Sequence, residues 1–132
     1  MEHALLTLML LCSPFEYTAE SGFVIQHNCN PVNTRFVDET FTKVMRGQPD
    51  WIAEYGPKIA RIDVATYYVE RPCNPTVLYA VLPAANGYVI VLHPDIFKNL
   101  DEASLGRAFR VYADILQWRQ APNAGELYGC LN

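Results

Sequence analysis

Clustered positive charge is missing from this 132-residue sequence. Its 10 Lys and Arg residues are scattered and are outnumbered by 14 Asp and Glu, which gives a formal charge of −4. Surfaces that bind nucleic acids or anionic membranes need clustered Lys and Arg, so the sequence argues against both partners. Hydrophobic residues make up 51% and charged residues only 18%, which predicts a globular chain, and its length fits a single domain over residues 1–132.

A hydrophobic run long enough to cross a bilayer is missing as well. The apolar stretch at residues 4–11 is ended by Ser13-Pro14, whereas a membrane-spanning helix needs about 20 apolar residues. We therefore expect no stable membrane insertion. Two interpretations of this stretch stay open. It is the hydrophobic region of a signal peptide that is cut near residues 19–21, or it is a first buried core helix, which the lack of positive charge in residues 1–3 favours.

Closely spaced cysteine pairs are also missing. Cys12, Cys29, Cys73 and Cys130 are dispersed, and none forms the C-x-x-C pair that zinc knuckles and thioredoxin-like redox sites use. An even number of dispersed cysteines is typical of disulfides in an oxidising compartment, although four buried thiols in the cytosol give the same pattern. The sequence favours a secreted or periplasmic protein over a cytoplasmic one.

The sequence around two of these cysteines favours one disulfide pairing. Cys29 and Cys73 each precede Asn-Pro in a predicted loop next to an element of the core. We predict a Cys29–Cys73 bond, which would stabilise the fold by about 4 kcal/mol on the chain-entropy model. Cys12 and Cys130 then form the second predicted pair, although four cysteines allow three connectivities.

Catalytic motifs are absent too. The sequence contains no G-x-S-x-G, no P-loop and no G-x-G-x-x-G. None of the three histidines, His3, His27 and His93, has another His at ligand spacing, and a metal site built from His27, Cys29, Cys73 and His93 would require distant loops to meet. We therefore expect no metal and no cofactor. A thiol nucleophile at Cys73 is the enzymatic alternative.

The sequence does contain one clearly marked structural unit, a hairpin followed by a helix. Two β-rich apolar runs, residues 76–85 and 88–92, are joined through Asn86-Gly87, which predicts an antiparallel hairpin with a type I′ turn. A polar connection follows, and then apolar residues at helical spacing predict a helix packed on one face of the hairpin. The residues of this apolar stripe are Leu105, Ala108, Phe109, Tyr112, Ile115 and Leu116.

Shorter patterns complete the predicted fold. Residues 22–26 favour a strand, residues 34–46 a helix with Asn33 as its N-cap, and residues 59–69 a half-buried strand. The tail at residues 122–132 is predicted to be a loop unless Cys130 ties it to the body. The order of these elements indicates an α+β fold, in which helices pack on one face of a small, mainly antiparallel sheet.

A resemblance to a known family begins at the hairpin. Residues 82–91, L-P-A-A-N-G-Y-V-I-V, followed by Leu100-Asp101-Glu102-Ala103 and Leu105, resemble the core segment of zincin metallopeptidases of the CAAX-prenyl-protease type. In that family the segment leads into an H-E-x-x-H helix, so the resemblance implies a zincin-like fold. At that place this chain has Val111-Tyr112-Ala113-Asp114-Ile115, which supplies neither imidazole ligand nor the general-base carboxylate. The resemblance therefore implies a fold without its metal chemistry.

Aromatic residues give the remaining functional signal. The chain has eight tyrosines and two tryptophans, of which Tyr67, Tyr79 and Trp118 fall where exposure is expected. Such residues are favoured anchors of protein interfaces. The sequence thus predicts a non-catalytic binding protein, such as an inhibitor, immunity protein or adaptor, whose partner is another protein. A hydrolase with a thiol site at Cys73 and a degenerate metallopeptidase-like protein are the alternatives.

Overall fold

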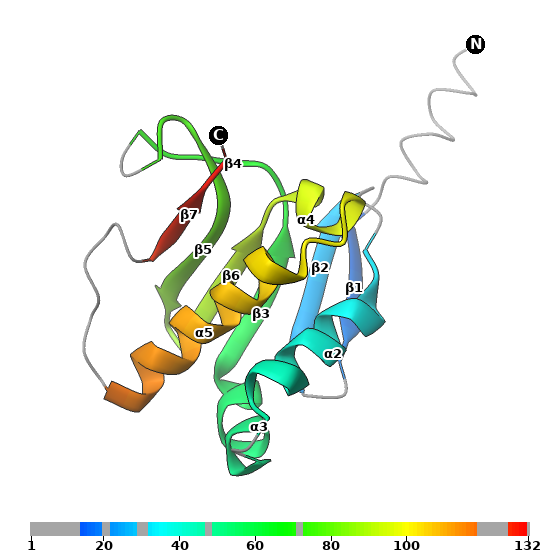
Figure 1. The fold of residues 1–132 in the computed structure, drawn as a ribbon, viewed down its shortest axis with the longest axis vertical. Coiled ribbons are helices and arrows are strands. Elements are labelled where there is room, and N and C mark those ends of the chain that lie inside the picture. The colour runs from blue at the N-terminus through cyan, green and yellow to red at the C-terminus, as the bar shows by residue number, and fades with distance from the viewer. Residues whose placement is uncertain are drawn as a thin grey trace.

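One sheet with helices on one face organises the chain (Figure 1). The computed structural model describes residues 14–19, 22–28, 32–46, 49–70, 73–118 and 127–131. The strands are β1 (Pro14–Thr18), β2 (Val24–Asn28), β3 (Ile59–Val64), β4 (Tyr67–Tyr68), β5 (Thr76–Ala84), β6 (Gly87–Leu92) and β7 (Tyr128–Cys130). The helices are α2 (Thr34–Val44), α3 (Pro49–Tyr55), α4 (Pro94–Lys98) and α5 (Glu102–Trp118), and a short 3₁₀ helix, η1 (Gly56–Lys58), follows α3.

The sheet is mixed. Its strands follow the order β1-β2-β3-β6-β5, with β4 and β7 both paired to β5. The β2–β3 and β3–β6 pairs are parallel and the other pairs are antiparallel. The centre is parallel because β2 reaches β3 through the crossover α2–α3, and because the β5–β6 hairpin places its second strand beside β3. The predicted α+β class, with helices on one face, is confirmed.

The main core lies between the sheet and helices α2 and α5. One row of the register, Ile25–Ile62–Ile90–Val81, crosses four strands and is completely buried. The predicted stripe of α5 packs on this face, and its residues from Leu105 to Ile115 are buried while Leu116 is partly buried. The predicted packing of α5 is therefore confirmed.

Helix α2 also matches its prediction. Asn33 is the N-cap, and its side-chain oxygen accepts a hydrogen bond from the backbone N–H of Phe36 at 3.0 Å. On the buried side of the helix, the Phe41 ring lies 5.3 Å from the Phe23 ring and 5.0 Å from the Phe109 ring, measured between centroids. These edge-to-face contacts join α2, α5 and the residue that precedes β2 into one core.

The predicted hairpin is confirmed, but its turn is shifted by one residue. Ala84 pairs with Gly87, so Ala85 and Asn86 form the turn and Gly87 opens β6. The type I′ prediction is wrong, since among the described residues Leu100 is the one non-glycine with positive φ. Gly87 has φ +140°, and a Cβ there would lie 2.0 Å from the carbonyl oxygen of Lys58. Glycine is needed because η1 approaches the hairpin closely.

Three further elements differ from the sequence prediction. Strand β3 ends at Val64, and residues 67–68 form a separate strand, β4, that pairs with Thr76 and Val77 of β5. The polar connection after β6 contains helix α4, whose N-cap is His93. The tail contains β7, which pairs with β5. The tail was predicted to be a loop unless Cys130 ties it to the body, and Cys130 is bonded to Cys73.

Candidate functional site

The three aromatic residues predicted to lie at an interface have different surroundings. Tyr67 is 41% exposed, and its neighbour Tyr68, at 67%, is the most exposed large hydrophobic residue in the described ranges. Tyr79 is only 6% exposed, so its predicted exposure is wrong. The side chain of Trp118 lies outside the described residues.

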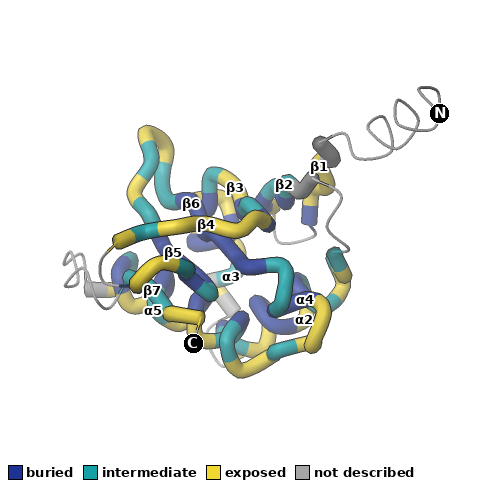
Figure 2. The backbone as a smooth tube through the Cα atoms, turned by 90° about the horizontal axis from the view of Figure 1, so that it is seen from above, coloured by how far each residue is buried: buried dark blue, intermediate teal, exposed yellow. Residues whose placement is uncertain are grey.

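Exposed apolar side chains gather at one end of β5. Tyr68 pairs with Thr76, and Leu131 donates its backbone N–H to the Thr76 carbonyl oxygen at 3.1 Å, so Tyr68 and Leu131 flank β5. Tyr67 pairs with Val77 in the next row. Successive side chains of a strand point to opposite faces, so Tyr68 and Leu131, which both lie beside Thr76, share one face of the sheet, whereas Tyr67 lies on the other. We call Tyr68 and Leu131 the β4–β7 patch, and Figure 2 shows β4 as an exposed strand.

The Cys73–Cys130 disulfide joins β7 to the bend before β5, next to this patch. The two sulfur atoms are bonded at 2.03 Å, and the Cα atoms lie 5.2 Å apart. Pairing of β7 with β5 places Cys130 opposite Val77, while the bend before β5 packs Cys73 into the same apolar cluster as Val77. Cys73 is 1% exposed, whereas Cys130 is exposed. The bond fixes β7 and the start of β5 as one unit.

This bond corrects the predicted disulfides. Both Cys29–Cys73 and Cys12–Cys130 are wrong, because Cys73 and Cys130 are bonded to each other. The repeated Cys-Asn-Pro sequence does not indicate which cysteines lie close in space. The pairing of β7 with β5 does, because it brings Cys130 close to Cys73. Cys12 and Cys29 lie outside the described residues. The thiol site at Cys73 is also not supported, since a bonded, buried sulfur is not a thiolate nucleophile.

Thiol titration of the denatured, unreduced protein should find at most two free thiols per chain. The chain has four cysteines, and two of them form the described bond. Peptide mapping without reduction should recover one peptide pair that joins the segments around residues 73 and 130. Four free thiols, or a mapped Cys29–Cys73 peptide, would contradict the structure.

Strand β7 packs closely on β5 beneath the patch. Gly129 pairs with Tyr79, and a Cβ at position 129 would lie 2.0 Å from Cε2 of the Tyr79 ring. Next to this contact, the backbone N–H of Val81 donates to the carbonyl oxygen of Leu127 at 2.9 Å. The Tyr79 ring is buried because it lies against a glycine, which explains why its predicted exposure failed.

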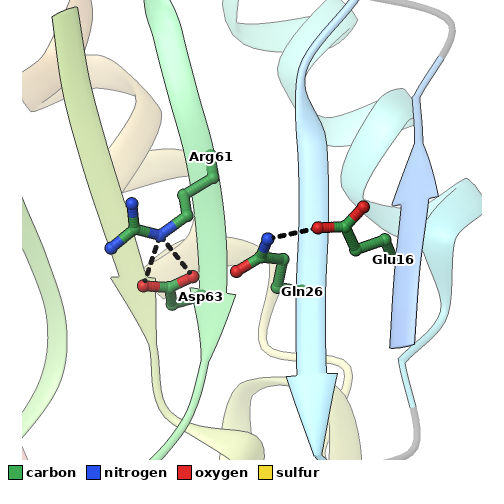
Figure 3. Close-up of polar contacts among 4 residues, drawn as sticks. All are labelled: Glu16, Gln26, Arg61 and Asp63. Carbon is green, nitrogen blue, oxygen red and sulfur yellow. Dashed lines mark hydrogen bonds and ion pairs between the residues drawn. The ribbon is translucent and has the colours of Figure 1, made fainter. Parts of the chain in front are cut away.

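A polar row occupies the helix-free face of the sheet (Figure 3). Gln26 donates to Glu16 at 2.6 Å across the β1–β2 pair, and Nε of Arg61 lies 3.0 Å from both carboxylate oxygens of Asp63. The register places Glu16, Gln26 and Asp63 side by side on three strands. Exposed pairs of this kind contribute about 0–1 kcal/mol each. Their partners are already within the chain, so the row offers no free acid–base pair.

Two open hollows lie on the helix side, and charged side chains form a large part of the lining of each. One, of about 450 Å³, lies along α2 and includes Lys43 and Glu102, which form an ion pair at 2.6 Å. The other, of about 840 Å³, runs along α5 past Val44, Arg107 and Arg110. Neither hollow contains a His or Cys side chain.

His93 has a structural role. Its Nδ1 atom accepts a hydrogen bond from the backbone N–H of Asp95 at 3.1 Å, which caps α4. His3 and the side chain of His27 lie outside the described residues. Within the part of the chain that is described, no group of three His, Cys, Asp or Glu residues is placed to hold a metal ion.

The purified protein should carry no stoichiometric zinc. On the resemblance to zincins, Val111 and Ile115 would take the positions of the two histidines, and Ile115 is buried in the core. Elemental analysis of protein purified without chelators would test this. About one zinc per chain would contradict the prediction and direct attention to His27, Cys29 and His93.

Tyr112 is a strongly perturbed titratable group of the described core. Its ring is fully buried, and its hydroxyl donates a hydrogen bond to the carbonyl oxygen of Tyr55. Burial raises the pKa of Tyr112 far above its ordinary value, and repulsion from ionised Tyr88 and Tyr55 raises it further. The hydroxyl is therefore a fixed hydrogen-bond donor of the core.

The free energy of unfolding should fall above about pH 10, where the unfolded chain releases the Tyr112 proton and the folded chain keeps it. This residue contributes a slope of up to about 1.4 kcal/mol per pH unit. Tyr112→Phe should be less stable near pH 7 by about 1–3 kcal/mol, because the Tyr55 carbonyl loses its donor, but should lose less stability at high pH. Urea unfolding from pH 7 to pH 11.5 measures both effects. Exposed Tyr68→Phe is the control, and equal slopes for wild type and Tyr112→Phe would contradict the assignment.

Comparisons with protein-family models, with curated proteins and with solved structures gave no match. Among the helices in the described ranges, none is both long enough and apolar enough to cross a membrane.

Proposed function

We propose that this chain is a non-catalytic protein-binding module, and that the β4–β7 patch is its contact surface. The observation that carries the proposal is the exposure of Tyr68, at 67%, on the same face of the sheet as the exposed Leu131. Large aromatic side chains supply much of the binding energy of protein interfaces. The expected partner is therefore another protein, as for an inhibitor, an immunity protein or an adaptor.

The surroundings of the patch support binding because they hold it in place. Both β4 and β7 pair with β5, and the Cys73–Cys130 bond joins β7 to the bend before β5. Side chains on a preorganised surface lose less conformational freedom on association, so more of their contact energy appears as affinity. Catalysis has no comparable support, since the former candidate nucleophile, Cys73, is part of the disulfide.

The same disulfide supports a secreted or periplasmic location as part of the proposal. Disulfides persist in oxidising compartments and are rare in the cytosol. A relation to zincin metallopeptidases is a further proposal, supported by the order β5–turn–β6–helix in this chain and by the residues quoted above. It would supply a fold without metal chemistry, which agrees with a binding role.

Site-specific photo-crosslinking tests the proposed contact surface. A benzophenone amino acid in place of Tyr68 should form a discrete adduct with one protein in the producing cells or their exported fraction. The matched control is the same amino acid in place of Tyr17, which is 36% exposed on the distant strand β1. The double variant Tyr68→Ser, Leu131→Ser should then bind the captured protein at least about ten-fold more weakly. Equal adducts from position 17, or unchanged affinity of the double variant, would overturn the proposal.

A further inference from the structure

Strand β7 is a short element that is docked on β5. It contains only three residues, and within the described part of the chain its strand partner is β5. Its flanking backbone hydrogen bonds run from Val81 N–H to Leu127 O and from Leu131 N–H to Thr76 O. So short a strand is marginal without additional support. The Cys73–Cys130 bond supplies that support by preventing β7 from leaving β5.

Undocking of β7 would change the surface of the protein. Gly129 lies against the Tyr79 ring, which is 6% exposed, so loss of β7 uncovers that ring. Leu127 and Tyr128 pack on the two apolar clusters of the sheet and would leave with the strand. Leu131 would leave the β4–β7 patch. The backbone groups of β5 that face β7 would become an open strand edge.

One end of the disulfide is accessible to a reductant. Cys130 is exposed, whereas Cys73 is buried at 1%. A thiolate of an external dithiol can attack Sγ of Cys130, which breaks the Cys73–Cys130 bond and releases the Cys73 thiolate. The second thiolate then breaks the mixed disulfide and releases Cys130. The dithiol loses two electrons and two protons, and the two cysteines take up both to become thiols.

We propose that the Cys73–Cys130 disulfide is a redox latch: a protein dithiol reduces it, β7 undocks, and the β4–β7 patch is dismantled. The effect on binding rests on the function proposed above, whereas the undocking of β7 does not. The oxidised protein is the binding form. The reduced protein loses Leu131 from the patch and exposes Tyr79 together with the edge of β5.

Hydrogen exchange tests the latch directly. The variant Cys73→Ala, Cys130→Ser removes this bond without acting on other cysteines. Its amide protons at Val81 and Leu131 should exchange at least ten-fold faster than in the oxidised wild type, since their acceptors are Leu127 and Thr76. Amides of β3 and β6, at the centre of the sheet, should keep their protection and serve as the internal control. Dithiothreitol treatment of the wild type should reproduce the result.

Two exchange outcomes would overturn the latch. Unchanged protection at Val81 and Leu131 would mean that β7 stays docked without the bond. Loss of protection throughout β3 and β6 would mean that the bond supports the whole fold. The crosslinking arm is separate: the position-68 adduct should weaken at least ten-fold when Cys73→Ala and Cys130→Ser are introduced, and an undiminished adduct would also overturn the latch. If the parent forms no adduct while β7 undocks as expected, the binding function fails and the conformational switch stands.

Discussion

Phe109→Ala should lower the free energy of unfolding by about 3–5 kcal/mol, the cost typical of removing a buried phenylalanine ring. Phe109 is fully buried on α5, and its ring lies 5.0 Å from that of Phe41 and 6.1 Å from that of Phe23, between centroids. Phe109 belongs to α5 and Phe41 to α2, and Phe23 immediately precedes β2. The substitution therefore leaves a cavity where α2, α5 and β2 meet, and rigid neighbours on three sides restrict its collapse.

Urea unfolding followed by far-ultraviolet circular dichroism would measure this loss. Tyr68→Ala is the matched control, because it also removes an aromatic ring but from a side chain that is 67% exposed, and it should change stability by about 0.5 kcal/mol or less. A loss below about 1 kcal/mol for Phe109→Ala would mean that the aromatic junction is not the centre of the core.

Gly87→Ala should destabilise the fold by at least about 2 kcal/mol, through backbone strain and steric overlap together. Gly87 has φ +140°, a conformation that side-chain-bearing residues rarely adopt, and the new Cβ would meet the Lys58 carbonyl oxygen at 2.0 Å. That oxygen belongs to the backbone and cannot rotate away as a flexible side chain would. Either the hairpin or the turn before β3 must move.

Substitutions at two other glycines separate the effects of backbone strain and steric overlap on the stability of Gly87→Ala. Gly22 has φ +95° but no atom within 4 Å of a new Cβ, so Gly22→Ala reports backbone strain alone and should cost less than Gly87→Ala. Gly106 lies in α5, where a new Cβ would make an ordinary 3.7 Å contact with Val44. Gly106→Ala should be neutral or stabilising by up to about 1 kcal/mol through helix propensity. A Gly87→Ala effect no larger than that of Gly22→Ala would contradict the steric argument.

Elements whose signals are local could be predicted from the sequence. The α5 stripe, the Asn33 cap and the β5–β6 hairpin depend on residues within a few positions of one another, and the structure contains all three. The turn was misplaced because its conformation depends on Lys58, which lies far from Gly87 in sequence. Local chemistry identified the Asn-Gly turn, whereas the requirement for glycine at position 87 comes from the tertiary contact with Lys58.

Elements that depend on contacts between residues far apart in the sequence could not be predicted from it. The tail around Gly129 looks like a loop because it is short and glycine-containing, and only the facing Tyr79 ring explains the glycine within a strand. The disulfide prediction failed for the same reason, since Cys130 meets Cys73 through β7. At the candidate site, the exposure of Tyr67 could be predicted, but Tyr68 was missed because residues 59–69 read as one continuous strand. The chain instead bends after Val64, which makes β4 a separate strand.

The position of β6 between β3 and β5 has a consequence for the order in which the chain can fold during synthesis. β3 is complete once Val64 has been made, yet the strand that covers its second edge ends at Leu92. A ribosome-bound chain that stops between these points carries an open strand edge beside the apolar Ile62 and Val64. Exposed edges of this kind promote association with other chains, so nascent chains of intermediate length depend most on chaperones. The β5–β6 hairpin, whose two strands are adjacent in sequence, closes that edge as a preassembled piece.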